Sequence, residues 1–254
     1  MKKLLPVFVL PLLLILLCGG CANSDRYYGI DHFSIREDGD AFREAMDALT
    51  VDVFRWYQSL EGEDGVYLMH YDLFTAETLA EWKAMGLYQT VPDEDVHYYT
   101  ASVNYLTDRG LSLSPEEQDL VAAGVRLYLL PESLSTAETA ALRAFLTEDA
   151  LLGVDGDSLI ETTFMSVGQI EFRTYHFDGT LEVPGGEEIS NPVIYVADTA
   201  NMSFFEAESL VATGVQDGYI RLTEDAYRQY AGDALPAELQ EQGLTFRGLS
   251  SMSN

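Results

Sequence analysis

Cysteine is nearly absent from this chain of 254 residues, because its two cysteines, Cys18 and Cys21, both lie at the N-terminus. The rest of the chain therefore has no disulfide, no cysteine-ligated zinc, no iron–sulfur cluster and no cysteine nucleophile. Basic residues are also scarce: 14 Lys and Arg stand against 42 Asp and Glu, for a formal net charge of -28. Nucleic-acid binding needs clustered Lys and Arg, so this composition argues against it and against direct attraction to an anionic membrane surface. Hydrophobic residues nevertheless make up 47%, which is typical of a folded globular body rather than a disordered chain.

The N-terminus reads as a targeting segment. Lys2 and Lys3 precede an apolar run over 4–17, which is short for a membrane span of about 20 residues. Small residues then precede Cys21, and this order resembles a bacterial lipoprotein signal, which implies that Cys21 carries the lipid (palmitate or a similar acyl chain). An uncleaved anchor over 4–21 is the alternative. Cleavage removes both N-terminal lysines and takes the net charge to -30.

We therefore divide the chain into a signal peptide (1–20), a lipidated cysteine with a tether that holds at most one short strand (21–39) and a single domain (40–254). Apolar spacing of three and four residues predicts several helices, and each of Ser114, Ser135 and Ser203 is followed three residues later by Glu in a capping-box pattern. The predicted helices span 40–60, 75–86, 115–124, 136–152, 204–214 and 223–242, the last with a break at Pro236. Alternating or buried-type apolar runs predict strands at 66–74, 96–103, 125–131, 162–167, 170–177, 192–198, 218–222 and 244–249.

Strands that alternate with helices predict an α/β or α+β fold, in which helices pack on a mixed β-sheet. The strands at 162–167 and 170–177 are expected to form a hairpin across Gly168 and Gln169. We see no fixed-period repeat and no linker long enough to separate domains.

Catalytic signatures are missing. There is no G-x-S-x-G, and the nearest serines, Ser102 and Ser166, fall inside predicted strands. No H-E-x-x-H occurs, although His70 with Asp72, and His97 with Asp93 or Asp95, remain open as ligand pairs. The acidic turn at 153–161 lacks the EF-hand spacing. We therefore predict no metal, no cofactor and no enzyme activity.

Aromatic residues are the better candidates for a binding surface, because they give a large contact area at low entropy cost. The chain has 15 tyrosines. Tyr98, Tyr99 and Tyr105 are the ligand-binding candidates, as an exposed surface for a peptide or sugar.

Four short motifs carry a family resemblance: Asn104-Tyr105-Leu106, 129–132 (LLPE), 175–179 (YHFDG) and 191–196 (NPVIYV). In this order, the chain over 40–250 resembles the extracytoplasmic domain of the bacteriocin-associated integral membrane proteins, which are permease-like proteins of ABC transporters. Members of that family continue into membrane-spanning helices, whereas this chain has no later apolar run of 18 residues. None of the motifs is catalytic.

The resemblance and the signal together lead us to expect a lipid-anchored accessory or binding protein on the outer face of the cytoplasmic membrane. Its expected partners are the membrane, through the lipid on Cys21, and an ABC permease or a cationic peptide, in export or bacteriocin immunity. Two alternatives stay open: a solute-binding lipoprotein of an ABC importer, and an envelope hydrolase.

Overall fold

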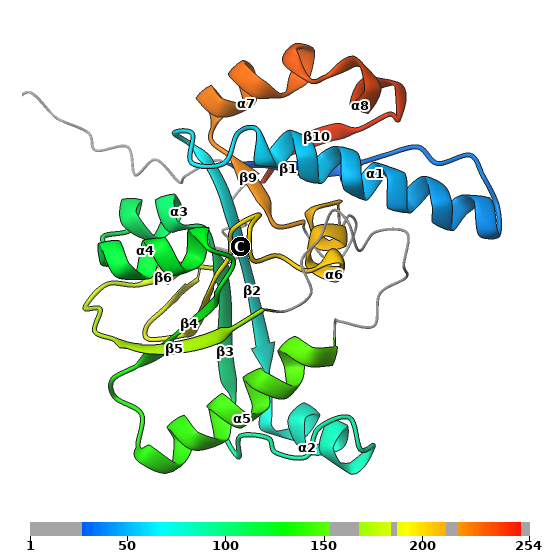
Figure 1. Cartoon of the computed structure of the whole chain (residues 1–254). Helices are drawn as coiled ribbons and strands as arrows, with labels where there is room; N and C mark the ends of the chain where they lie inside the picture. The colour runs from blue at the N-terminus through cyan, green and yellow to red at the C-terminus, as the bar shows by residue number, and fades with distance from the viewer. Residues whose placement is uncertain (1–26, 153–167, 184–186, 212–217, 250–254) are drawn as a thin grey trace, which may run out of the picture.

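A single eight-stranded mixed sheet forms the centre of the molecule (Figure 1). The computed structural model describes residues 27–152, 168–183, 187–211 and 218–249. The strands of this sheet follow the order β10-β1-β9-β2-β3-β8-β4-β5. Their bounds are β1 (Tyr27–His32), β2 (Val66–Phe74), β3 (Val96–Ala101), β4 (Arg126–Pro131), β5 (Ile170–Tyr175), β8 (Val193–Val196), β9 (Ile220–Leu222) and β10 (Thr245–Leu249). The mixed-sheet fold class expected from the sequence is confirmed.

The strand directions decide which strand ends meet. β2 and β3 form the longest antiparallel ladder, from Met69↔Ala101 to Phe74↔Val96. β3 then pairs with β8 in parallel, β8 with β4 antiparallel, and β4 with β5 in parallel. Because β3 and β8 run in the same direction, the residues that follow Ala101 and Val196 lie at the same edge of the sheet.

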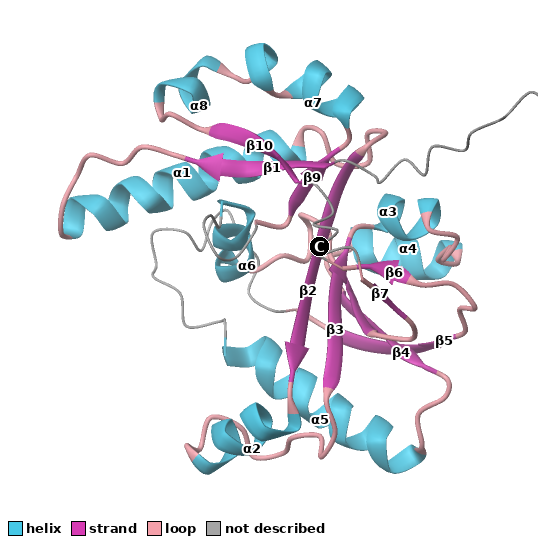
Figure 2. Ribbon diagram, turned by 180° about the vertical axis from the view of Figure 1, so that it is seen from behind, coloured by secondary structure: helices cyan, strands magenta, loops and turns pink. Residues whose placement is uncertain are grey.

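Helices cover both faces of the sheet (Figure 2). They are α1 (Asp40–Gln58), α2 (Ala76–Ala84), α3 (Val103–Asp108), α4 (Pro115–Ala122), α5 (Thr136–Leu152), α6 (Phe204–Glu208), α7 (Glu224–Tyr230) and α8 (Ala237–Glu241), with 3-10 turns at Ser209–Val211 and Gly232–Ala234. One face packs against α1, α2, α5, α6, α7 and α8, and the other against α3, α4 and a small hairpin of β6 (Leu181–Glu182) and β7 (Glu188–Ile189). β4 serves both faces, since Tyr128 and Leu130 enter the first core and Leu127 and Leu129 the second.

Capping residues fix where the helices begin. Before α4, the Ser114 N–H donates to Glu117 Oε2 at 2.7 Å and the Glu117 N–H donates to Ser114 Oγ at 3.3 Å. The same reciprocal pair occurs before α6, between Ser203 and Glu206. The pattern read from the sequence is therefore confirmed as a set of real hydrogen bonds, each satisfying two helix-end donors.

Three expectations from the sequence were wrong. The segment 21–39 is more than a tether, because β1 pairs with both β10 and β9 and its Ile30 is 2% exposed, so the folded body already includes Tyr27. The strand predicted over 96–103 ends at Ala101, and α3 begins directly after it. The three- and four-residue apolar spacing that predicts α1 starts at Phe42 and so places Phe42 on the apolar face of the helix, yet its side chain is 45% exposed.

Other expectations fall partly outside the described residues. The strand at 162–167, the acidic turn at 153–161 and Ser166 all lie there. Within the described residues, β5 forms its ladder with β4, in parallel. None of the helices in the described part of the chain is both long and apolar enough to cross a membrane.

Candidate functional site

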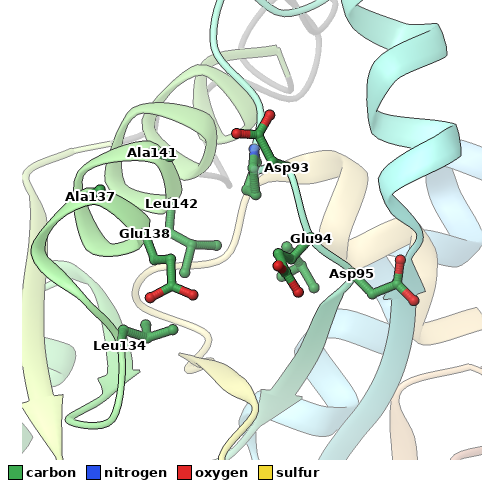
Figure 3. A pocket seen from close by; sticks show the side chains of 10 residues that line it. Asp93, Glu94, Asp95, Leu134, Ala137, Glu138, Ala141 and Leu142 are labelled. Atoms are coloured by element: carbon green, nitrogen blue, oxygen red, sulfur yellow. The ribbon is translucent and has the colours of Figure 1, made fainter.

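A surface pocket of about 380 Å³ lies between the loop before β3 and the first turns of α5 (Figure 3). This volume is near the lower end of the range of about 300–1,000 Å³ for small-ligand pockets. Its lining combines carboxylates with apolar groups and, among the described residues, includes no Lys or Arg. The lining residues are Pro92, Asp93, Glu94, Asp95, Val96, Leu134, Ala137, Glu138, Ala141 and Leu142.

Two of the four carboxylates hold the walls of the pocket in place. Asp95 Oδ1 accepts a hydrogen bond of 2.8 Å from the Ala76 N–H, which ties the loop to the start of α2. Glu138 Oε2 accepts from the Ser135 N–H at 2.7 Å, and the Glu138 N–H donates back to Ser135 Oγ at 3.2 Å. This capping box, expected from the sequence, places Glu138 at the pocket rim. Hydrogen bonds from Ser135 lower the pKa of Glu138, so its carboxylate is charged at neutral pH.

The other two carboxylates, those of Asp93 and Glu94, do not fix the walls of the pocket. Among the described residues, Asp93 and Glu94 have no hydrogen-bond or ion-pair partner for their side chains, and both are exposed. Figure 3 shows Glu94 and Glu138 on opposite sides of the hollow, with Leu142 between them, and the Asp95 carboxylate turned away. The pocket thus offers negative charge at its rim and an apolar floor, which suits a cationic group that carries an aliphatic or aromatic part.

The three tyrosines predicted to bind a ligand are buried, so the expected exposed tyrosine surface is wrong. Tyr98 and Tyr99 are neighbours on a central strand, and their side chains enter opposite cores. Tyr99 and Tyr105 stack in parallel with their hydroxyls 3.0 Å apart, and the Tyr99 hydroxyl donates to the Glu182 carbonyl at 2.6 Å. Tyr98 is 7% exposed, Tyr99 0% and Tyr105 1%, so all three side chains pack inside the protein. Ligand binding by these three tyrosines stays a prediction.

The histidine pairs left open by the sequence are partly formed. His70 Nε2 lies 3.3 Å from Asp72 Oδ1, whereas His97 Nδ1 is hydrogen-bonded to the Tyr71 hydroxyl at 2.8 Å. An exposed third histidine, His176, contacts two acids instead, and they raise its pKa. In the part of the chain that the structure describes, no group of three or more His, Cys, Asp or Glu is placed to hold a metal ion.

Ser102 is not presented as a nucleophile. It is the N-cap of α3, where its Oγ donates to Asn104 Oδ1 at 2.6 Å and accepts from the Leu68 N–H at 3.1 Å. Among the described residues, no serine or threonine hydroxyl is hydrogen-bonded to a histidine ring.

A buried ion pair, which no pattern in the sequence indicates, lies on the first face of the sheet. The Arg126 side chain is 6% exposed and donates two hydrogen bonds to the Glu206 carboxylate. One of them runs from Arg126 Nη1 to Glu206 Oε2 over 3.0 Å. Its Nε donates to the Tyr128 hydroxyl at 2.8 Å, and its guanidinium carbon lies 4.1 Å from the centre of the Tyr195 ring. Every donor group of Arg126 thus faces a partner inside the protein, so we assign this network to the architecture of the core.

The acidic pocket was only half visible in the sequence. Pro92 followed by three acidic residues is typical of a loop, and Ser135 with Glu138 indicates a helix start. Nothing in the local pattern joins two segments that are about 40 residues apart in the chain. Their contact is a consequence of the sheet, which sets β3 two places from β4, the strand that leads into α5.

Comparisons with protein-family models, with curated proteins and with solved structures found no match. The resemblance to the bacteriocin-associated integral membrane proteins therefore stays a prediction.

Proposed function

We propose that this protein is a lipid-anchored, extracytoplasmic binding protein that captures the cationic part of a peptide in the acidic pocket. We further propose that it works without catalysis, on the outer face of the cytoplasmic membrane, as an accessory of an ABC exporter or in bacteriocin immunity. Cys21 is the proposed site of lipidation.

The pocket carries the first part of this proposal. Its two unengaged carboxylates, Asp93 and Glu94, line the same pocket as the buried side chains of Val96 and Leu142. A cationic side chain of the peptide would pair with the carboxylates. A neighbouring aliphatic group of the peptide would pack on the apolar side chains and be removed from contact with water. The net charge of -28 adds a long-range attraction that raises the association rate of cations in general.

A two-lobed importer component has less support. Such a protein needs a cleft between two separate lobes, whereas the eight principal strands of the described residues form one continuous sheet. The hydrolase alternative likewise finds no serine–histidine contact among the described residues.

A peptide-binding experiment tests the pocket. The whole chain in neutral detergent is titrated into a labelled Arg-Arg-Leu-Arg-Arg peptide, and fluorescence anisotropy is followed at low and at high salt. We expect saturable binding that weakens with salt, because charges separated by more than about 8 Å are screened at physiological ionic strength. A peptide with Glu in place of Arg is expected not to bind.

The matched variants separate the pocket from the overall charge. The double variant Asp93→Asn/Glu94→Gln should weaken binding about tenfold, which corresponds to about 1.4 kcal/mol. The control Asp119→Asn/Glu241→Gln removes the same charge from exposed positions on α4 and α8 and should change affinity less than twofold. Equal losses in both double variants would show that only the net charge matters and would overturn the pocket proposal.

Lipidation has its own test. Cells fed a labelled fatty acid should label the wild-type protein and a Cys18→Ala variant, but not a Cys21→Ala variant. Label retained in Cys21→Ala would reject the anchor and leave the pocket proposal untouched.

A further inference from the structure

A second hollow lies on the other flank of α5 from the acidic pocket. It has a volume of about 480 Å³ and is lined by Leu134, Thr136, Thr139, Ala140 and Arg143. Successive residues of an α-helix are turned by about 100°, so the α5 residues that line this hollow and those that line the acidic pocket point to opposite flanks of the helix. Leu134, which precedes the helix, lines both. The two hollows are therefore neighbours at the start of one helix.

The two hollows differ in charge. The acidic pocket is lined by four carboxylates, whereas Arg143 is the charged side chain that lines the second one, here called the Arg143 hollow. The hydroxyls of Thr136 and Thr139 line it as well and can donate hydrogen bonds. A guanidinium with hydroxyls beside it suits a carboxylate, because the planar guanidinium can donate two parallel hydrogen bonds to the two carboxylate oxygens.

Arg143 is oriented by an aromatic ring and not by an acid. Its guanidinium carbon lies 4.9 Å from the centre of the Phe172 ring. Phe172 is the register partner of Tyr128 in the ladder of β4 and β5, and the two rings stack at 5.4 Å. In the part of the chain that the structure describes, the Arg143 side chain forms no hydrogen bond and no ion pair. The contact with the ring thus orients the guanidinium and leaves its N–H donors available.

One carboxylate of the protein is close enough to compete for Arg143, but it is already engaged. Glu171 Oε2 accepts from Arg173 Nη1 at 2.9 Å, and Glu171 Oε1 accepts from the Gln169 side chain. These hydrogen bonds lower the pKa of Glu171, and the charge of Arg143 adds to the effect. Arg143 therefore remains available for an anion that does not belong to the described residues.

We propose that the Arg143 hollow binds a carboxylate of the same peptide whose cationic side chain occupies the acidic pocket. This carboxylate is the C-terminus of the peptide or an acidic side chain. The inference rests on the proposed function, since the acidic pocket has to hold the cationic part. It narrows the ligand class from cationic peptides in general to peptides that carry a carboxylate at a set distance from the cation.

The helix between the two hollows sets that distance. Ala137 and Ala140 are neighbours on the outer side of α5 and both are exposed, so a peptide that crosses there meets no long side chain. A helix with its side chains is about 10–12 Å across. An extended peptide advances about 3.3–3.6 Å per residue, so about three residues separate the cation from the carboxylate.

Three labelled peptides test this inference by fluorescence anisotropy with the whole chain in neutral detergent. They are Arg-Arg-Leu-Ala-Ala with a free C-terminus, the same peptide with a C-terminal amide, and Arg-Arg-Leu-Ala-Asp with a C-terminal amide. The net charge of -28 alone favours the peptide amide of Arg-Arg-Leu-Ala-Ala, which lacks the negative charge of the other two. We expect the opposite order, with at least one carboxylate form bound about threefold more tightly than this amide, as an exposed ion pair allows. The carboxylate form with the higher affinity identifies the source of the group.

Variants locate the carboxylate. Arg143→Gln should abolish the preference, so that the amide binds at least as tightly as the carboxylate forms. Arg143→Lys should keep part of it, because lysine keeps the charge but not the planar fork. Arg55→Gln removes the same charge from an exposed position on α1, and this matched control should keep the full preference. Arg143 is exposed too, so neither glutamine variant should lower the melting temperature by more than a few degrees.

The outcomes separate this inference from the proposed function. If wild type binds the amide as tightly as both carboxylate forms, while Asp93→Asn/Glu94→Gln weakens all three peptides, the proposed function stands and the role of Arg143 is overturned. A preference that survives in Arg143→Gln, or that Arg55→Gln removes equally, also overturns it. If none of the peptides binds saturably, the proposed function and this inference fail together.

Discussion

The Arg126–Glu206 pair makes a sharp prediction about stability. Replacing Glu206 by Gln keeps the size of the side chain but removes the negative charge that neutralises the Arg126 guanidinium. The Arg126 side chain is only 6% exposed. Breaking a buried pair by removing one partner typically costs about 3–5 kcal/mol, because the other charge stays buried without compensation. Gln keeps one carbonyl oxygen that can still accept from Arg126, so we expect the lower end, about 3 kcal/mol.

Glu206 has a second task that must be measured separately. Its Oε2 also accepts from the Ser203 N–H at 2.7 Å, which caps α6. Loss of an N-cap side chain costs about 1 kcal/mol, so Ser203→Ala should cost about that amount and no more. Ser203→Ala removes the hydroxyl that accepts from the Glu206 N–H, the other half of the capping box, so its cost gives the scale of the capping contribution. A loss well above that scale in Glu206→Gln reports the ion pair.

Urea unfolding followed by tryptophan fluorescence is the suitable assay, because urea leaves the ionic strength unchanged and Trp56 is buried in the same core. The double variant Arg126→Met/Glu206→Met should recover most of the loss and lie within about 2 kcal/mol of the wild type. A cost below about 1 kcal/mol for Glu206→Gln would refute the reasoning, since the pair would then behave like an exposed salt bridge.

Three further predictions follow from the other features. Burial and the charge of Asp198 raise the pKa of folded Glu61 to about 7, so stability should fall by about 3 kcal/mol as the pH rises from 4.5 to 7, because folded Glu61 retains a proton that the unfolded chain releases; Glu61→Gln should flatten this dependence in urea titrations at successive pH values. Ala137→Phe should fill the acidic pocket and abolish binding of the arginine peptide, while the free energy of unfolding changes by less than about 1 kcal/mol, since Ala137 is exposed on α5. Tyr99→Phe should cost about 1–2 kcal/mol, because it removes the hydroxyl bonded to the Glu182 carbonyl and to Tyr105, and it should leave peptide affinity unchanged in anisotropy measurements.

The sequence predicts an element correctly where the residues that determine it lie close together in the chain. The strand Val66–Phe74 was predicted with the bounds that the structure has, because its run of β-branched, aromatic and apolar residues lies between a glycine turn and a helix start. The capping boxes were read correctly because both partners lie within four residues of each other. α3 was missed because Ser102 continues a run of strand-forming residues and its side chain makes no capping bond that would mark a helix start.

The sites depend on contacts that no local pattern contains. Tyr98 and Tyr99 looked like one aromatic surface, yet adjacent residues of a strand point to opposite faces and a central strand has no exposed face. Glu61 and Asp198 are separated by 137 positions in the sequence. They lie at the same edge of the sheet because β2, which begins after Glu61, runs antiparallel to β3, whereas β8, which ends before Asp198, runs parallel to β3. An abundance of 42 acidic residues also hides any particular pair among many others.

The position of β1 has a consequence for how the body would carry mechanical load. In the proposed anchored form, Cys21 lies six positions before Tyr27, and six extended residues reach at most about 20 Å, so the membrane would pull almost directly on β1. This strand is an inner strand, held by β10 on one side and β9 on the other, and its first residue is paired with Leu249 in β10. Tension on the lipid would therefore act mainly on the ladder between β1 and β10, with the pair Tyr28↔Leu222 between β1 and β9 beside it. A truncation that removes β1 would leave β9 and β10 with unpaired edges that invite aggregation.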